Sequence, residues 1–243
     1  MGIPVAELKG EAKARFVAGM FARIAGRYDL LNTVMTGGMH HRWRRLATRL
    51  VSEGLHGPAL DVATGTGDFA FALAKQPGIQ EVVGADIVGP MLEVAGRKAK
   101  QRKLERRVSF LQADVLALPF PDDTFACATA GFAVRNVTDV LAAISEMARV
   151  VQPGGRVAIL EILPVKTRGP ISQAMRLYFR RVVPLLGRVL TGDQQAYTYL
   201  PDSVDAFLAV HELAGVMENA GLRIVRSRTV GMGTVGILVG EKG

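Results

Sequence analysis

Apolar residues recur along the middle of the chain in short runs that alternate with stretches of helical periodicity. Five runs predict strands, at residues 59–63, 81–86, 107–114, 124–131 and 156–162. Three intervening stretches have apolar residues three or four positions apart and predict helices, at residues 68–75, 89–104 and 138–151. Strands that alternate with helices build right-handed βαβ units, so the pattern predicts an α/β fold with a parallel sheet and helices on both faces.

The two ends of the chain have different patterns from the middle. Residues 11–56 and 168–220 are helical in periodicity, and the second stretch is interrupted by Pro184, Gly187 and Gly192. The last stretch reads LRIVRSRTV, a GMG turn and TVGILVG, which predicts a β-hairpin over 222–240. The hairpin adds an antiparallel pair to the five strands of the middle, so we expect a seven-stranded, mostly parallel sheet in a single domain.

Composition narrows the class of protein. The chain has 243 residues, of which 49% are hydrophobic, and this length suits one domain with a substantial core. We expect a cytoplasmic protein, because no apolar run is long enough to span a bilayer and the N-terminus is mixed and charged. Cys127 is the sole cysteine and lies in a predicted strand, so we expect a small core residue. The four histidines have no metal-site spacing, and no metal is expected.

The formal net charge of +8 favours contact with polyanions, either nucleic acid or an anionic membrane surface. An equally simple interpretation is a solvated basic face. The densest cluster of cations is Arg97–Arg107, which we expect on the exposed side and at the end of a helix.

The sharpest local motif is LDVATGTGDFAFALA, at Leu60–Ala74. A strand ends near Asp61, and Gly65 and Gly67 form a turn before the next helix. Glycine lets the backbone adopt a positive φ and lets a ligand approach closely. Asp86 ends the second strand, nineteen residues after Gly67, where it can accept hydrogen bonds from ribose hydroxyls. Asp114 ends the third predicted strand, where a carboxylate can accept from an adenine amino group.

Asp68 separates the two nucleotide classes that such a turn could bind. A dinucleotide would place its pyrophosphate at this helix N-terminus, where an acid would repel it. S-adenosylmethionine has no phosphate and carries a sulfonium and an ammonium group, so Asp61 and Asp68 are plausible partners for its cations. The alternative for Asp68 is a simple helix cap. The acids and glycines together favour S-adenosylmethionine.

Three longer stretches carry a resemblance to a known family. They are IAGRYDLLNTVMTGGMHHRWRR (Ile24–Arg45), the turn LDVATGTGDFA, and FAVRNVTDVLAAISEMARVVQPGGRVAILE (Phe132–Glu161). Together they resemble the C-methyltransferases of menaquinone and ubiquinone biosynthesis, over roughly residues 16–240. The resemblance implies a Rossmann-like class I methyltransferase fold that binds S-adenosylmethionine. It implies cofactor contacts by Thr66, Asp86, Asp114 and Val115, to which we add Met91.

The substrate implied by the resemblance is a reduced polyprenyl quinol, whose ring carbon attacks the sulfonium methyl. The enzyme must then lower the pKa of the ring hydroxyl, remove its proton and align the two reactants. We assign Arg135 to the developing phenolate and Asn136 to orienting a water or a quinol oxygen; the alternative is that the pair caps the next helix. The general base is left open among five side chains, and for each one taken alone a structural role is favoured: His40, Tyr28, Asp29, Tyr197 and Tyr199.

The expected division is an N-terminal helical cap (1–56), a cofactor-binding core (57–164), a helical substrate cover (165–220) and a C-terminal hairpin (221–243). Met175–Leu190 combines an apolar face with four arginines, so it either lies on a membrane at the inner face of the cell or faces the core. Demethylmenaquinol is the expected substrate, and a ubiquinone-pathway benzoquinol is the alternative. A basic RNA methyltransferase and a non-catalytic cofactor-binding module are less favoured, so no nucleic-acid partner is expected. A homodimer stays open.

Overall fold

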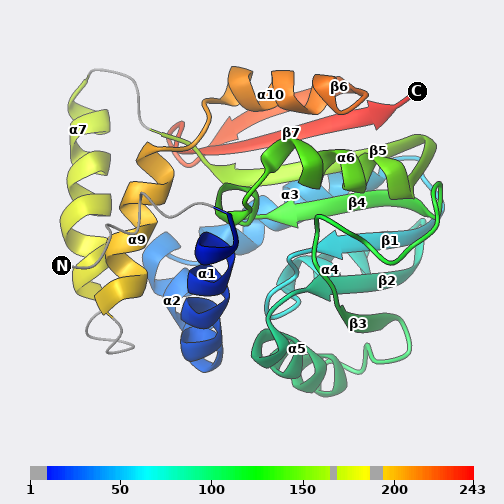
Figure 1. Ribbon diagram of the computed structural model, residues 1–243, viewed down its shortest axis with the longest axis horizontal. Helices are drawn as coiled ribbons and strands as arrows, with labels where there is room; N and C mark the ends of the chain where they lie inside the picture. Colours follow the sequence, from blue (N-terminus) through cyan, green and yellow to red (C-terminus); the bar gives the residue numbers. More distant parts are fainter. Residues whose placement is uncertain (1–9, 165–168, 187–193) are drawn as a thin grey trace.

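The computed structural model describes residues 10–164, 169–186 and 194–243, and Figure 1 follows them along the chain. Within these residues, seven strands form one sheet in the order β3-β2-β1-β4-β5-β7-β6. The strands are β1 (Gly57–Val62), β2 (Ile79–Asp86), β3 (Val108–Gln112), β4 (Phe125–Gly131), β5 (Val151–Ile162), β6 (Leu222–Val230) and β7 (Val235–Lys242).

The sheet has the predicted mixture of directions. The pairs from β3 through β5 are parallel, and β7 is antiparallel to both β5 and β6. The strand order reverses between β1 and β4, and ligands of open α/β sheets bind at such a switch point, beyond the carboxyl ends of the strands. The predicted α/β fold with a C-terminal hairpin is therefore confirmed.

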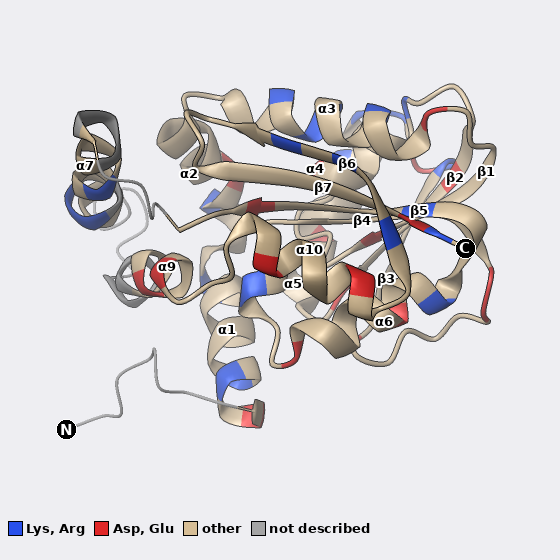
Figure 2. Ribbon diagram, turned by 90° about the horizontal axis from the view of Figure 1, so that it is seen from above, with Lys and Arg blue, Asp and Glu red and all other residues tan. Residues whose placement is uncertain are grey.

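Helices cover both faces of the sheet. One apolar core unites α3 (Met39–Ser52), α4 (Asp68–Leu73) and α5 (Gly89–Gln101) with one face. A second core unites α6 (Val140–Val150) and α10 (Val210–Asn219) with the other. Seen from above, α3 lies on the opposite side of the strands from α6 and α10 (Figure 2). Cys127 is fully buried in this sheet, as predicted, and burial raises the pKa of its thiol to about 12.

The remaining helices gather beyond one end of the sheet (Figure 1). They are α1 (Gly10–Ile24), the short η2 (Ala25–Arg27), α2 (Tyr28–Thr36), α7 (Pro170–Leu177), the π-helical η4 (Tyr178–Val182) and α9 (Gln194–Asp205). Four of them, α1, α2, η4 and α9, share an apolar cluster that includes Met20, Leu31, Tyr178 and Tyr199. Within the described ranges, no helix is both long and apolar enough to cross a bilayer.

Two local predictions differ from the structure. The segment Pro153–Gly155, which lies between the predicted helix over 138–151 and the predicted strand over 156–162, belongs to β5. β4 pairs Phe125 with Val151 and Cys127 with Arg156, and the intervening residues form a bulge. The third strand ends at Gln112, so Asp114 lies in the loop that follows rather than at the strand end. Ala113, directly after β3, still donates its amide to the carbonyl of Asp86, so the start of this loop stays beside the end of β2.

Candidate active site

The glycine turn after β1 has the backbone conformation that the motif predicts. Ala63, Gly65 and Gly67 have φ values of 50°, 55° and 84°, in the left-handed region. A Cβ on Gly67 would lie 3.0 Å from the rings of Phe71 and Phe110, so any larger residue there would also crowd the core. Conformation and space both require glycine at position 67.

Asp61 holds this turn from beneath. Its carboxylate accepts hydrogen bonds from the Thr64 hydroxyl (2.5 Å), the Thr129 hydroxyl (2.7 Å) and the Ala70 amide (3.0 Å). Burial raises the pKa of Asp61 to about 6, against the opposing effect of these hydrogen bonds. The side chain therefore connects β1, the turn, α4 and β4 at the switch point.

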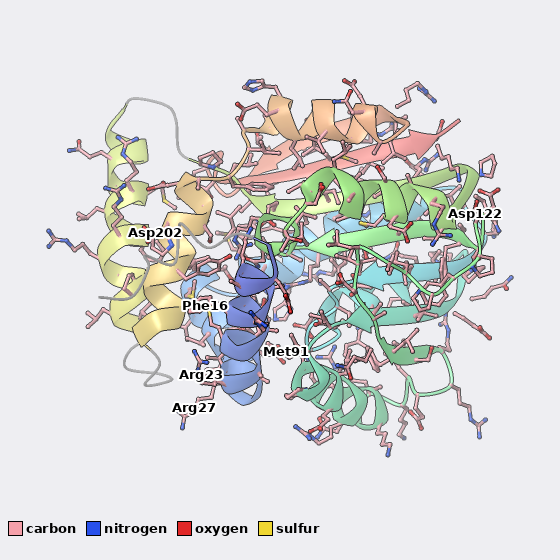
Figure 3. The ribbon with its side chains drawn as sticks, in the orientation of Figure 1. Phe16, Arg23, Arg27, Met91, Asp122 and Asp202 are labelled. Carbon is pink, nitrogen blue, oxygen red and sulfur yellow. The ribbon has the colours of Figure 1, made fainter. Side chains whose placement is uncertain are left out.

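A cavity of about 130 Å³ lies over the turn. It is lined by five of the nine predicted cofactor residues: Gly65, Asp86, Met91, Asp114 and Val115. The carboxylate of Asp86 accepts from the amides of Gly65 (2.7 Å) and Val88 (2.8 Å), which fixes its orientation at the end of β2. Burial raises the pKa of Asp86. Figure 3 shows Met91 at the start of α5, facing α1.

The other four predicted cofactor residues are not among those that line this cavity. Asp61 and Gly67 support the turn as described. The Thr66 hydroxyl donates to Asp29 (2.5 Å), and Lys98 donates to Asp29 (2.6 Å) and Asp68 (2.8 Å). Burial by itself would raise the pKa of Asp68, but Lys98, Arg44 and Arg102 together outweigh it and hold that pKa below its usual range. The network attaches α2 to the turn and to α5, so Asp68 already has a cationic partner within the protein.

Lys98 belongs to the basic cluster that we expected on an exposed helix surface. Its side chain is only 13% exposed, because it lies between Asp29 and Asp68. Asp29, one of the suggested bases, is thereby engaged on both carboxylate oxygens. Contacts between α2 and α5 bring these groups together, and no local pattern could have indicated them.

A larger cavity, about 350 Å³, adjoins the first. Its walls come mainly from apolar and aromatic side chains of α1, α2, α3, β5, η4 and α9, and they include the predicted residues Tyr28, His40 and Arg135. Three residues line both cavities: Phe21, Tyr28 and Phe132. The two cavities therefore meet where these aromatic rings lie, and Asn136 lines the smaller one nearby.

Arg135 is held by a buried carboxylate. Its guanidinium donates to Glu161 (2.5 Å) and to the carbonyl of Phe132 (2.7 Å). Glu161 is fully buried at the end of β5, and it also accepts from the backbone amide of Arg135 (3.3 Å). Among the described residues, Nε of Arg135 is buried without a hydrogen-bond partner. Glu161 was missed in the sequence, although it ends the stretch that carries the resemblance.

His40 contacts partners through both ring nitrogens. The Arg44 guanidinium donates to Nδ1, which must therefore accept. Thr33 donates its hydroxyl proton to the Asp29 carbonyl, so its oxygen accepts from Nε2 at 3.3 Å. Burial, then Arg44, lowers the pKa of His40 to about 3. A neutral ring with no free lone pair suits a structural part of the cavity wall better than a general base.

His40, His41 and Asp68 place potential metal-ligand atoms within 4.8 Å of one another. Arg44 donates to His40, while Lys98 and Arg102 pair with Asp68. The neighbouring side chains are thus cations that already engage two of the three ligands. The expectation that no metal is bound stays a prediction.

Phe132 was quoted in the sequence motif but given no role. It follows β4 with a φ of 60°, an uncommon conformation for an aromatic residue. Its ring packs edge-on against Trp43, 6.4 Å between centroids, and beneath the Arg44 guanidinium at 5.2 Å. Strained residues of this kind cluster at functional sites. Phe132 thereby forms part of the boundary between the two cavities.

The strand order, the glycine turn and the cavity above it define the fold of a class I S-adenosylmethionine-dependent methyltransferase. Solved structures agree: a putative methyltransferase from Methanococcus maripaludis has a TM-score of 0.62, with 99% of this chain and 97% of that chain covered at 18% identity. A possible histamine N-methyltransferase from Thermotoga maritima has a TM-score of 0.61, with 93% and 99% covered at 20% identity. At these identities the likeness concerns the fold alone.

The chain belongs to the ubiE/COQ5 methyltransferase family, whose model matches residues 8–242. A demethylmenaquinone methyltransferase of Thermus thermophilus is 46% identical over 92% of this chain and its own full length. One from Deinococcus radiodurans is 44% identical, covering 95% and 94%. A ubiquinone/menaquinone biosynthesis C-methyltransferase of Teredinibacter turnerae is 38% identical, covering 95% and 92%. The resemblance seen in the sequence is confirmed.

Proposed function

We propose that this enzyme transfers a methyl group from S-adenosylmethionine to a ring carbon of demethylmenaquinol, which yields menaquinol. One observation carries the proposal: an apolar cavity of about 350 Å³ adjoins the cavity over the glycine turn and shares Phe21, Tyr28 and Phe132 with it. An apolar aromatic diol and the methyl donor can therefore lie next to each other in a site that excludes water. The names of the relatives in Thermus and Deinococcus support the same substrate.

The residues of the smaller cavity fit S-adenosylmethionine. The Asp86 carboxylate accepts from the Gly65 and Val88 amides, and its two oxygens have enough lone pairs to accept from a ribose hydroxyl as well. Asp114 and Val115 form the adenine end in our assignment, and Met91 supplies apolar contact. The acids around the turn suit a ligand without phosphate. When bound, the cofactor supplies a methyl group already activated by its sulfonium, so the proposed reaction needs no metal.

Arg135 is the residue that we assign to the quinol oxygen. A cation in an apolar wall favours the phenolate over the phenol, and ionisation raises the electron density of the ring carbon. Arginine is a poor base, with a pKa above about 12, so in this proposal a water molecule carries away the hydroxyl proton. The methylated ring carbon then loses its own hydrogen as a proton, and the phenolate oxygen is protonated again to give the quinol. Glu161 fixes the guanidinium so that it faces the cavity. Asn136 orients the water or a quinol oxygen.

A benzoquinol of the ubiquinone pathway is the second candidate substrate. The relative from Teredinibacter, named for both pathways, supports it. The choice can be tested with purified enzyme, labelled S-adenosylmethionine and short-chain forms of both reduced quinols. We expect a higher kcat/KM for demethylmenaquinol. Transfer to the benzoquinol alone would reverse the assignment, and transfer to RNA but to neither quinol would refute it.

A membrane surface is the place where such a lipid substrate would be collected. Leu177 and Leu185 are 58% and 61% exposed, and Arg180 and Arg181 are exposed beside them. Figure 2 shows basic residues, coloured blue on the ribbon around α7, at one extremity of the molecule. Tyr178, from the same segment, lines the larger cavity. We therefore propose that the segment from Leu177 to Leu185 makes peripheral contact with anionic lipid at the cytoplasmic face of the membrane.

Vesicle sedimentation tests this contact. Binding to anionic vesicles should fall with added salt, and it should fall severalfold in the variant Leu177→Ser with Leu185→Ser. Leu141→Ser on α6, where the residue is 44% exposed, is the matched control and should bind like the unmodified protein. Binding to neutral vesicles as strong as to anionic ones would contradict a basic docking segment. So would a loss of binding in Leu141→Ser equal to that in the double variant.

A further inference from the structure

Helix α1 forms a wall of both cavities. Ala14 and Val17 line the smaller cavity, Met20 and Ile24 line the larger, and Phe21 lines both. Figure 3 shows Phe16 on this helix, which runs between α9 and the start of α5. The position of α1 therefore controls the shape of the site for both reactants.

Lys13 attaches the first part of this helix to the segment after β4. Its ammonium group donates to the carbonyls of Val137 (2.8 Å) and Arg135 (3.2 Å). These carbonyls lie at the end of η3 (Val134–Asn136), where helical carbonyls lack partners within the helix. An ammonium donor makes these hydrogen bonds charge-assisted. Burial and the nearby Arg135 lower the pKa of Lys13.

The attached segment carries the two side chains assigned to the quinol. Arg135 is held from the sheet side by Glu161, which accepts from both its amide and its guanidinium. Lys13 holds its carbonyl from the other side. The same helix also reaches Asn136 indirectly, because Phe16 packs edge-on against Tyr199 at 5.8 Å and Tyr199 donates to Asn136.

We infer that Lys13 is a positioning residue of the methyl transfer: it holds α1 over the two cavities and, through the same two hydrogen bonds, holds the segment that carries Arg135 and Asn136. The inference rests on the proposed function only in the roles given to those two residues. Lys13 lines neither cavity, so it acts through the groups that it holds.

Loss of Lys13 leaves two half-buried carbonyls without their donor, which makes both segments less rigid. Lys13→Met keeps the length of the side chain and removes the donors, while Lys13→Arg keeps them. Arg15→Met is the matched control, since Arg15 lies on the same helix in an exposed ion pair with Glu11.

Hydrogen–deuterium exchange of the full chain provides a readout without substrate. With Lys13→Met we expect faster exchange in two separate segments, residues 10–24 and 133–138, and unchanged exchange in β1 and β4. Lys13→Arg and Arg15→Met should match the unmodified protein. Faster exchange in α1 alone, or equally in Arg15→Met, would overturn the inference.

Kinetics provide the second readout. For Lys13→Met we expect kcat to fall about tenfold and affinity for S-adenosylhomocysteine to weaken about threefold, with Lys13→Arg restoring most of both. Unchanged kcat would overturn the positioning role. If the unmodified enzyme proves to methylate neither quinol, the proposed function fails, while exchange and S-adenosylhomocysteine affinity still decide whether Lys13 holds the site together.

Discussion

The hydroxyl of Tyr199 donates a 3.0 Å hydrogen bond to Oδ1 of Asn136, and this bond joins the walls of the two cavities. Tyr199 lines the larger cavity, whereas Asn136 lines the smaller. Burial raises the pKa of Tyr199, so the hydroxyl stays protonated and acts as the donor at neutral pH. Of the side chains suggested as a base, Tyr199 is thus a fixed hydrogen-bond donor, and the side chain of Tyr197 lies outside the described residues.

Replacing Tyr199 with Phe tests this connection. The variant keeps the ring that packs on Phe16 but leaves Asn136 without its donor, so Asn136 is less well oriented. We expect kcat to fall about five- to tenfold, consistent with about 1 kcal/mol for a hydrogen bond, with nearly unchanged affinity for S-adenosylhomocysteine. Steady-state kinetics and calorimetry measure the two quantities. Full activity would show that the bond has no role in turnover.

Asp86→Asn should weaken cofactor binding. The introduced carboxamide has a single acceptor oxygen, so it can accept from Gly65 or Val88 but not from both, and it loses the charge that strengthens bonds to ribose hydroxyls. We expect affinity for S-adenosylhomocysteine, measured by calorimetry, to fall at least about tenfold. Asp122→Asn is the control, because this exposed residue lies far from Met91 (Figure 3). Equal affinities in the two variants would refute the ribose contact.

Arg135→Lys should separate chemistry from folding. Lysine keeps the charge opposite Glu161 but lacks the planar fork, so kcat should fall about a hundredfold while cofactor affinity stays within about twofold. Arg135→Ala is less informative, because it leaves Glu161 as an unpaired buried charge at a cost of about 3–5 kcal/mol. The double variant Arg135→Met with Glu161→Met should fold but not turn over. Normal turnover in Arg135→Lys would remove the guanidinium from the mechanism.

His40 makes stability depend on pH in a defined direction. Its folded pKa is about 3 and its unfolded value is near 6.5, so below pH 6.5 the unfolded chain takes up a proton that the folded protein does not. Stability from this residue is complete above pH 6.5 and is lost as the pH falls towards 3. Urea unfolding should show that the free energy of unfolding is lower at pH 5 than at pH 7.5. We expect His40→Gln to make this difference smaller by roughly 1 kcal/mol.

The contribution of Asp61 to the pH dependence of stability has the opposite sign to that of His40. Its raised folded pKa, about 6, means that the folded protein takes up a proton before the unfolded chain does, so this contribution grows as the pH falls from 6 towards 4. The unmodified protein and the His40→Gln variant both contain Asp61, so its contribution to the pH dependence of stability cancels when the two are compared. The exposed His56, changed to Gln, is the control. An equal acid response in the His40 and His56 variants would contradict the low pKa of His40.

Some parts of the site could be predicted because they are local. Gly65 and Gly67 are required by one turn, and Asp86 is placed by the strand that it ends, so their positions follow from short patterns. The Arg135 segment could be located from its motif. The central strands were found because short apolar runs reflect burial directly, although the limits of β3 and the bulge in β5 depend on pairing between strands.

Local patterns in the chain were enough to establish the α/β class, the hairpin, the cofactor turn and the family. Contacts between distant segments decided the rest: Lys13 reaches Arg135 across 122 positions, and Lys98 reaches Asp29 across 69. Periodicity records which face of an element is buried, but not which element covers it. Whether a lysine is a solvated surface charge or a buried contact therefore depends on the packing of α1, α2 and α5, which only the folded chain shows.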